Sequence, residues 1–384
     1  MNLLPQKVAQ NLVLAAALGS PFAISPAFGQ EAAQTTSWAD AVLTPFWASS
    51  HMSNETLLFE KMPDKRYAEA KLLFVPIGIV SVTSADGATV FEEGRDYVWK
   101  KNSDTLTLTK HSRIPTKTWA DMHPPKGSPG TLGEAVGGNT TLLFDPAGAV
   151  LHTIQVAATY DHDEKWNGFV PQAAEKEIPK SIAKLRAKEK LNLVVFGDSI
   201  SVGTGASGTF HAPPNQPPYV GLVEEGLRAR FGAELTVKNI SEGGQDTTWG
   251  VTTAPKVADE NPDLVLIAFG MNDAGRAIPA ADYAQNIQKM IDTIRQKRPD
   301  TEFLLVTTMI GNAEWAQLTF PLFAEYRDAL TRMAGPGIAV ADVTSVWEDI
   351  LKTKKFLDIT GNGLNHPNDF GYRVYAQVIL QAMQ

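Results

Sequence analysis

The sequence predicts an α/β fold with a parallel sheet in its second half, preceded by a smaller all-β domain. From Leu191 onward, short apolar segments alternate with longer amphipathic stretches. Such alternation builds a parallel sheet with helices on both faces. Between about residues 30 and 170, short Thr- and Leu-rich segments are separated by turn formers such as Asp86-Gly87. Several short strands without long helical patterns are typical of a small β-sandwich.

The composition is that of a globular protein without disulfide bonds. The 384 residues are enough for two domains, and the share of charged residues, 20%, is ordinary for a globular chain. The formal net charge of -8 argues against a nucleic-acid partner, which would require a basic face. Because the chain has no cysteine, thiolate chemistry and cysteine-ligated zinc are excluded. No histidines or acidic residues show the spacing of metal ligands, so no metal site is predicted.

The amino terminus has the pattern of a secretory signal peptide. Lys7 is the only charged residue before Glu31, and an apolar stretch follows it from Leu12 to Ala23. Small residues then stand at Ala27 and Gly29, the two positions that a signal peptidase reads, and we expect cleavage near Gly29. The stretch is short and interrupted by proline, which favours a cleaved peptide, residues 1–29, over an uncleaved anchor. Since no later segment approaches the ~20 apolar residues of a membrane span, the mature protein is expected to be secreted or periplasmic.

The β-sandwich is expected over residues 30–170. Four segments have the length and residue types of strands: Lys71–Val75, Thr105–Thr109, Thr141–Phe144 and Thr153–Ala157. The alternation in Thr105–Thr109 indicates a strand with one face in a core and the other in water. Residues 171–190 are charged and rich in alanine, and we interpret them as a partly helical linker.

The second domain is expected over residues 191–384. Its strand candidates are Leu191–Phe196, Leu235–Asn239, Leu264–Phe269, Phe303–Thr307 and Ile338–Val343. Its helical patterns lie at Tyr219–Phe231, Thr247–Glu260, Ala280–Lys297, Leu322–Met333 and Phe370–Met383. This order predicts a three-layer α/β/α domain, in which ligands bind at the carboxyl ends of the strands.

Four short segments could meet at that edge of the sheet: Gly197–Ser201, Asn239–Gln245, Gly270–Asp273 and Asn365–Asp369. They contain the groups that acyl transfer needs, namely a nucleophile, a base and donors aimed at the developing oxyanion. Ser199 can be the nucleophile and His366 the base. The backbone N–H groups of Ser199 and Gly244 and the side-chain amide of Asn272 are the candidate donors, since a glycine lets the backbone approach closely and an amide donates without charge.

In their order and residue types, these four segments resemble the SGNH hydrolases, also called the GDSL esterase/lipase family, over residues 191–384. The resemblance implies a flavodoxin-like α/β/α fold and ester hydrolysis without a metal or cofactor. It also implies that Ser199 is the nucleophile, His366 the base, and Gly244 and Asn272 oxyanion donors. The first domain resembles the accessory sandwich that precedes the catalytic domain in some SGNH carbohydrate esterases.

One position departs from the family pattern. The family usually has an aspartate three residues before the histidine, where this sequence has Gly363. An imidazole needs an acceptor for one N–H, but not necessarily a charged one. The orienting group is therefore left open between Asp358, Asn362 and a backbone carbonyl, and we hypothesise a Ser-His dyad or a shifted triad.

Three further side chains are candidates for the substrate pocket. Trp249 and Trp315 follow predicted strands and could stack on sugar rings, although Trp249 is equally suited to the core. His211 lies in a loop after the nucleophile and could line the pocket or remain at the surface.

The sequence thus predicts a secreted serine esterase that removes O-acetyl groups from a polysaccharide or glycan. Its expected partner is this ester substrate, with no nucleic acid and no membrane span. The alternatives are a general carboxylesterase, arylesterase or lipase, a glycan O-acetyltransferase, and a glycan-binding protein whose catalytic site is dead.

Overall fold

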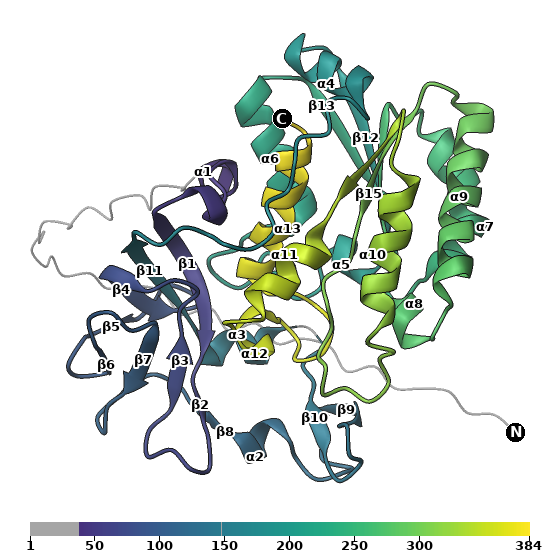
Figure 1. Ribbon diagram of the computed structural model, residues 1–384. Coiled ribbons are helices and arrows are strands. Elements are labelled where there is room, and N and C mark those ends of the chain that lie inside the picture. Colours follow the sequence, from purple (N-terminus) through teal and green to yellow (C-terminus); the bar gives the residue numbers. More distant parts are fainter. Residues whose placement is uncertain (1–37, 147) are drawn as a thin grey trace, which may run out of the picture. The chain divides into compact units, whose positions relative to one another are not determined.

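The computed structural model describes residues 38–146 and 148–384 (Figure 1). The predicted signal peptide and its cleavage site near Gly29 lie outside these residues. No helix in the described part of the chain is long and apolar enough to cross a membrane. The described residues belong to one compact unit, and the domain boundaries at residues 170 and 190 stay a prediction.

The second half of the chain contains the predicted parallel sheet. Its strand order is β13-β12-β14-β15-β16. The strands span Leu191–Gly197 (β12), Leu235–Asn239 (β13), Leu264–Ala268 (β14), Glu302–Val306 (β15) and Ile338–Ala341 (β16). Strands β12, β14 and β15 are buried along nearly their whole length, which explains their continuous apolar sequences.

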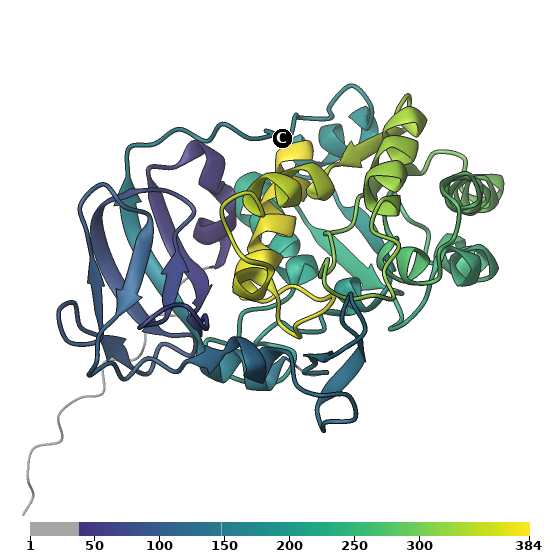
Figure 2. The same cartoon turned by 60° about the horizontal axis from the view of Figure 1, so that its bottom comes forward.

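Helices cover both faces of this sheet, which confirms the α/β/α arrangement (Figures 1 and 2). One layer contains α7, α9 and α10, and the other contains α6 and α13. These helices span Tyr219–Phe231 (α6), Thr247–Asp259 (α7), Ala280–Lys297 (α9), Leu322–Met333 (α10) and Asp369–Ala382 (α13). In this half of the chain, four helices were not predicted: α5 (Ser199–Val202), α8 (Met271–Gly275), α11 (Val343–Ile350) and α12 (Phe356–Ile359).

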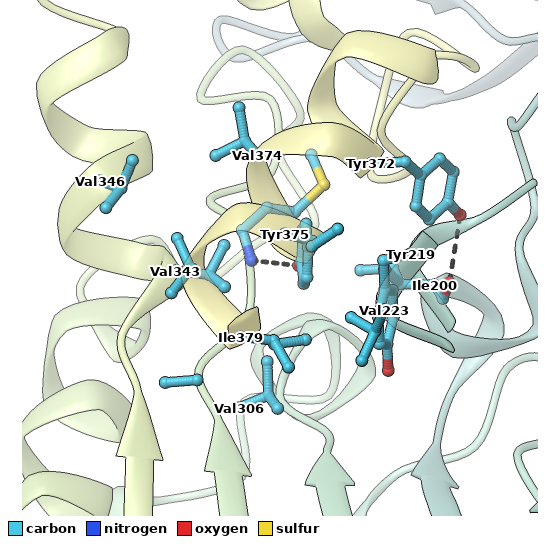
Figure 3. Close-up of a cluster of buried hydrophobic side chains, with 14 of the residues drawn as sticks. Ile200, Tyr219, Val223, Val306, Val343, Val346, Tyr372, Val374, Tyr375 and Ile379 are labelled. Carbon is cyan, nitrogen blue, oxygen red and sulfur yellow. Dashed lines mark hydrogen bonds between the residues drawn. The ribbon is translucent and has the colours of Figure 1, made fainter. Parts of the chain in front are cut away.

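Helix α13 is buried along nearly its whole length and connects the core to the turn that follows Ser199. Figure 3 shows Tyr372 and Tyr375 of this helix among apolar side chains from the sheet and from α6. The Tyr372 hydroxyl donates to the carbonyl of Ile200 at 3.1 Å and to that of Thr204 at 2.8 Å. Packing of the last helix therefore holds the backbone beside Ser199.

The first part of the chain contains two β-sheets with side chains in one hydrophobic core, as expected for a β-sandwich. One sheet has the order β1-β11-β4-β5 and the other β6-β7-β3-β2-β8, and only the β2–β8 pair is parallel among these strands. A separate hairpin pairs β9 with β10. The bounds are His51–Leu58 (β1), Glu60–Lys61 (β2), Glu69–Lys71 (β3), Pro76–Ser84 (β4), Val90–Phe91 (β5), Tyr97–Trp99 (β6), Thr105–Leu108 (β7), Lys117–Thr118 (β8), Thr131–Glu134 (β9), Thr141–Leu143 (β10) and Gln155–His162 (β11). This part also contains three short helices, α1 (Trp38–Leu43), α2 (Trp119–Met122) and α3 (Ala149–Ile154), and a 3₁₀ turn at Phe46–Ala48.

Two of the four strand predictions in this region are wrong in their bounds. Strand β3 ends at Lys71, because the N–H of Leu73 donates to the buried carboxylate of Glu55 instead of a neighbouring strand. The segment predicted as a strand from Thr153 begins inside helix α3 (Ala149–Ile154). The Asp145 carboxylate accepts two N–H groups at the start of this helix, and this local cap outweighs the β-forming residues.

The stretch predicted as a linker contains helix α4 (Pro179–Arg186). Its Ile182 and Leu185 are fully buried, and the helix contacts α6 and β12. The helical part of residues 171–190 is therefore packed on the α/β layers.

Candidate functional site

Ser199 lies at the first turn after strand β12. Gly197 ends the strand where no side chain fits, because a Cβ there would lie 2.5 Å from the Ser201 hydroxyl. The carboxylate of Asp198 accepts the N–H of Ile200 at 2.9 Å and caps helix α5. The half-buried Ser199 side chain begins the helix.

His366 is brought to Ser199 by the loop before α13. Its Nε2 lies 2.7 Å from the Ser199 Oγ. The loop is closed by the N–H of Gly361 and the hydroxyl of Thr360, which both donate to the His366 carbonyl at 2.9 Å. Burial lowers the pKa of His366 to about 4, so the imidazole is neutral near pH 7 and able to take a proton.

Asn362 is the group that contacts the other imidazole nitrogen. Its Oδ1 accepts the backbone N–H groups of Leu364, Asn365 and His366, each at 3.0 Å. A carbonyl oxygen can accept three such groups and an NH₂ cannot, so the amide orientation follows from these contacts. Its Nδ2 then faces the His366 Nδ1 at 2.5 Å. Asn362 therefore presents a donor, not an acceptor, to the imidazole.

The structure does not bring Asp358 to the imidazole. Its carboxylate accepts the N–H of Leu58 at 2.8 Å and that of Lys355 at 3.1 Å. Both contacts lie on the side of the first β-sheet and of helix α12. Among the two side chains left open by the sequence, Asn362 is the one next to His366.

Gly363, at the position where the resemblance implies an aspartate, has no room for a side chain. Its backbone has a φ of +87°, and a Cβ would lie 2.5 Å from the carbonyl oxygen of Leu143. Leu143 belongs to strand β10. This strand is part of the first β-region, the name used here for the part of the chain that contains strands β1 to β11. The departure from the family pattern thus coincides with chain from another part of the molecule filling the space.

The glycine loop that contains the proposed oxyanion donor Gly244 approaches Ser199 through Gly243. Gly244 has a φ of +76°, is exposed, and a Cβ built on it meets nothing described within 4 Å. The neighbouring Gly243 is close to Ser199, since its Cβ position lies 3.8 Å from the Ser199 Cβ. The Asn272 Nδ2 donates one N–H to the Gln245 carbonyl at 2.8 Å, which leaves its second N–H for a substrate.

The sequence analysis did not identify Arg276, which holds the loop of Gly244 in place through two contacts. Its Nη2 donates to the Gly244 carbonyl at 2.8 Å, and its Nη1 lies 2.5 Å from the Asp246 carboxylate. Asp246 is the N-cap of helix α7. The spacing of Arg276 from Asn272, four residues across helix α8, was the signal available in the sequence.

Two buried carboxyl groups lie behind the site. Burial raises the pKa of Asp198 to about 7 and that of Asp273 to about 6. Asp273 accepts the N–H of Thr247 at 3.1 Å and its hydroxyl at 2.5 Å. These contacts give Asp273 a structural role, since its carboxylate holds the start of helix α7.

Trp315 is buried beneath the β9–β10 hairpin. Only 8% of it is exposed, and its indole fills the space beside Gly133. It forms a small apolar cluster with Ala135, Leu142 and Leu364. Its ring is therefore covered by protein and is not open for stacking on a sugar.

The other two pocket candidates lie in different surroundings. Trp249 is half-buried and packs against Phe196 and Phe269, with ring centroids 5.6 and 6.2 Å apart. His211 is exposed and makes no hydrogen bond to Ser199 or His366 among the described residues. Trp249 thus belongs mainly to the core behind the strands.

Comparisons with known proteins find similar sequences for part of this chain. Residues 195–374 match the model of the GDSL-like lipase/acylhydrolase family. An arylesterase of Vibrio mimicus is 35% identical over 114 residues, which cover 29% of this chain and 52% of that relative. Esterase TesA of Pseudomonas aeruginosa is 33% identical over 104 residues, covering 27% of this chain and 48% of that relative. The chain spans about half the length of these curated relatives.

Similar solved structures include a two-domain esterase active on acetylated mannans, with 22% identity and a TM-score of 0.45 over 56% of this chain and 54% of that one. The crystal structure of TesA matches 50% of this chain and 98% of its own, with 20% identity and a TM-score of 0.39. The family match and the four segments around Ser199 together lead to one conclusion. Residues 195–374 form a domain of the GDSL-like lipase/acylhydrolase family.

Proposed function

We propose that this protein is a serine ester hydrolase that works through an acyl-enzyme. The observation that carries the proposal is the 2.7 Å contact between the Ser199 Oγ and the His366 Nε2. The comparisons with an arylesterase and with Esterase TesA support the reaction class.

In the first step the Ser199 Oγ attacks the ester carbonyl and its proton passes to the His366 Nε2. The N–H groups of Ser199 and Gly244 and the Asn272 amide hydrogen-bond the oxyanion, each contributing about 2.7–4 kcal/mol in the transition state. The imidazolium then protonates the leaving alcohol as the C–O bond breaks. A water, deprotonated by His366, attacks the acyl-enzyme and releases the acid and free Ser199.

The tautomer of His366 limits this reaction. Base catalysis requires an unprotonated Nε2, so Nδ1 must carry the proton. The Asn362 Nδ2 donates toward Nδ1 and favours the opposite tautomer, with the proton on Nε2. We therefore expect slower turnover than in a triad with a carboxylate at this position.

The proposed substrate is an O-acetyl group on a polysaccharide or glycan, with the protein exported by its signal peptide. The side chains beside the Gly243-Gly244 loop are polar. The Gln245 side chain donates to the Glu242 carboxylate at 2.8 Å, and the exposed Arg276 donates to the Gly244 carbonyl. Such surroundings suit a hydroxyl-rich carrier better than a long acyl chain. Export is supported by the apolar stretch from Leu12 to Ala23 after Lys7.

The second candidate function is hydrolysis of small aryl esters. It is favoured by the 35% identity to the Vibrio mimicus arylesterase. The same chemistry at Ser199 would serve both substrates, so the leaving group distinguishes them.

Turnover of p-nitrophenyl acetate by the wild type and by Ser199→Ala tests the reaction class. We expect turnover that Ser199→Ala abolishes, and equal rates in both would overturn the enzyme proposal in favour of a dead, glycan-binding site. Acetate release from acetylated xylan, pectin and monosaccharides then tests the substrate. Faster release from a polymer than from aryl acetates supports the glycan, and transfer of acetyl to an added sugar would instead indicate a transferase.

A further inference from the structure

The loop that carries His366 contacts the first β-region at several points. At the imidazole end, the N–H of Asp145 donates to the Asn362 carbonyl at 3.1 Å. The carbonyl of Leu143 and the side chain of Leu151 lie 2.5 and 3.8 Å from the Cβ position of Gly363. The chain from β10 to α3 thus occupies the space beside Asn362 and Gly363, four and three residues before His366.

The tip of the same loop is held by apolar packing. Leu364 is fully buried against Leu142 of strand β10 and against Trp315. Asn312 binds the other side, with its N–H donating to the Leu364 carbonyl at 2.8 Å and its Nδ2 to the Gly363 carbonyl at 2.9 Å. The hairpin and the loop after β15 therefore hold Leu364 between them.

The base of the loop is bound by buried polar groups of the first sheet. The Gln155 Nε2 donates to the carbonyls of Leu357 at 3.0 Å and Thr360 at 2.8 Å. The Asn368 Nδ2 donates to the Gln155 Oε1 at 3.3 Å. Figure 1 shows α12 next to β1, where the two elements are in contact.

A buried ion pair strengthens this attachment. The Lys354 Nζ lies 2.5 Å from the Glu55 carboxylate and donates to the Lys71 carbonyl at 2.6 Å, and both charged side chains are fully buried. The Tyr160 hydroxyl also donates to Glu55, at 2.5 Å. Because a buried charge is strongly destabilising without its partner, separating Lys354 from Glu55 would be costly, and the ion pair holds the two parts of the chain together.

We propose that the first β-region is a positioning element of the catalytic site. It fixes the loop that presents His366 to Ser199, and its backbone fills the space of the absent aspartate. The inference rests on the proposed Ser-His reaction. It predicts that residues 191–384 do not form a complete catalytic unit without residues 141–155.

Substitution of Asp145 tests the proposal, because its buried carboxylate fixes the segment between β10 and α3 that contacts Asn362. It accepts the N–H groups of Val150 at 2.5 Å and Leu151 at 2.9 Å. Asp96 is the matched control, since it is also buried in the β-region and accepts two backbone N–H groups, of Glu92 at 2.8 Å and Arg113 at 2.9 Å. No described contact joins Asp96 to the His366 loop.

In full-length protein, Asp145→Ala should lower kcat on p-nitrophenyl acetate about tenfold or more, with KM within about twofold. Asp96→Ala should lower the Tm and leave kcat within about twofold. Leu142→Ala, which removes packing from Leu364, serves if Asp145→Ala does not fold. The inference is overturned if Asp145→Ala or Leu142→Ala folds with unchanged kcat, or if Asp96→Ala loses kcat as strongly.

A second readout separates this inference from the proposed function. The ring ¹⁵N signals of His366, assigned with His366→Gln in the Ser199→Ala background, report imidazole order and tautomer without turnover. Asp145→Ala should shift or broaden these signals, and Asp96→Ala should not. If the wild type is inactive but the His366 signals change in Asp145→Ala and not in Asp96→Ala, only the proposed esterase activity is refuted. Unchanged signals in Asp145→Ala would refute the positioning role.

Discussion

Asn362→Asp should convert the Ser199–His366 pair into a triad. The change is nearly isosteric, so one carboxylate oxygen can still accept the three backbone N–H groups that Oδ1 accepts now. The other oxygen replaces the Nδ2 at 2.5 Å from the His366 Nδ1 and becomes an acceptor. Asn365, whose Oδ1 now accepts from Nδ2 at 2.8 Å, is half-exposed and can turn its amide to donate instead.

The magnitude follows from the imidazole's surroundings. Burial holds the pKa of His366 at about 4, and an adjacent carboxylate raises such a pKa by roughly 1–3 units. The carboxylate also favours the tautomer with the proton on Nδ1, which leaves Nε2 free to accept from Ser199. In the Ser-His-Asp triad of serine proteases the reverse change, from carboxylate to amide, lowers kcat about 10⁴-fold, so we expect a gain on the order of 10²- to 10⁴-fold here.

The assay is kcat/KM for p-nitrophenyl acetate as a function of pH. His366 acts in its neutral form, so activity falls as the pH drops below its pKa, and Asn362→Asp should move this acidic limb to higher pH. Asn365→Asp is the control, since it adds a carboxylate nearby without an acceptor at Nδ1. The reasoning is refuted if Asn362→Asp is no faster and its acidic limb does not move, or if Asn365→Asp gives the same gain.

Three further predictions concern the surroundings of the site. Arg276→Lys should lower kcat about tenfold, the effect of roughly 1.4 kcal/mol in the transition state, because lysine cannot bind Gly244 and Asp246 together; steady-state kinetics with unchanged kcat would contradict the brace. Lys354→Met should cost roughly 3–5 kcal/mol in urea unfolding, because it leaves the Glu55 carboxylate buried without its partner; an unchanged midpoint would be inconsistent with a buried ion pair. Asp198 has its pKa raised by burial from 3.8 to about 7, so the folded state binds the extra proton and stability is lost as pH rises through this window. Asparagine mimics the protonated carboxyl group, so the Tm of Asp198→Asn relative to that of the wild type should rise as the pH increases from 3.8 to about 7. A Tm difference that does not change with pH would contradict the raised pKa.

The α/β half of the fold was predictable because its signals are local. The apolar runs at Leu191–Gly197 and Leu264–Ala268 are buried on both faces, so their sequences show the strands directly. The predicted bounds of α6 and α9 match the structure. The β-region was less predictable, since a strand such as Lys71–Val75 ended where the Glu55 carboxylate, distant in sequence, took the backbone N–H of Leu73.

The sequence alone was enough to predict the candidate site groups and their order along the chain. These are Ser199 in a turn after β12, a glycine loop, Asn272, and His366 before the last helix. These groups follow from residue type and from their position at strand ends. Only the tertiary structure decided that Asn362 contacts the imidazole, because this depends on how the loop folds around three backbone N–H groups. It also decided that Leu143, from a region more than two hundred residues earlier, closes the space beside Gly363. Contacts between distant segments leave no local pattern in the sequence, and they set the surroundings of His366.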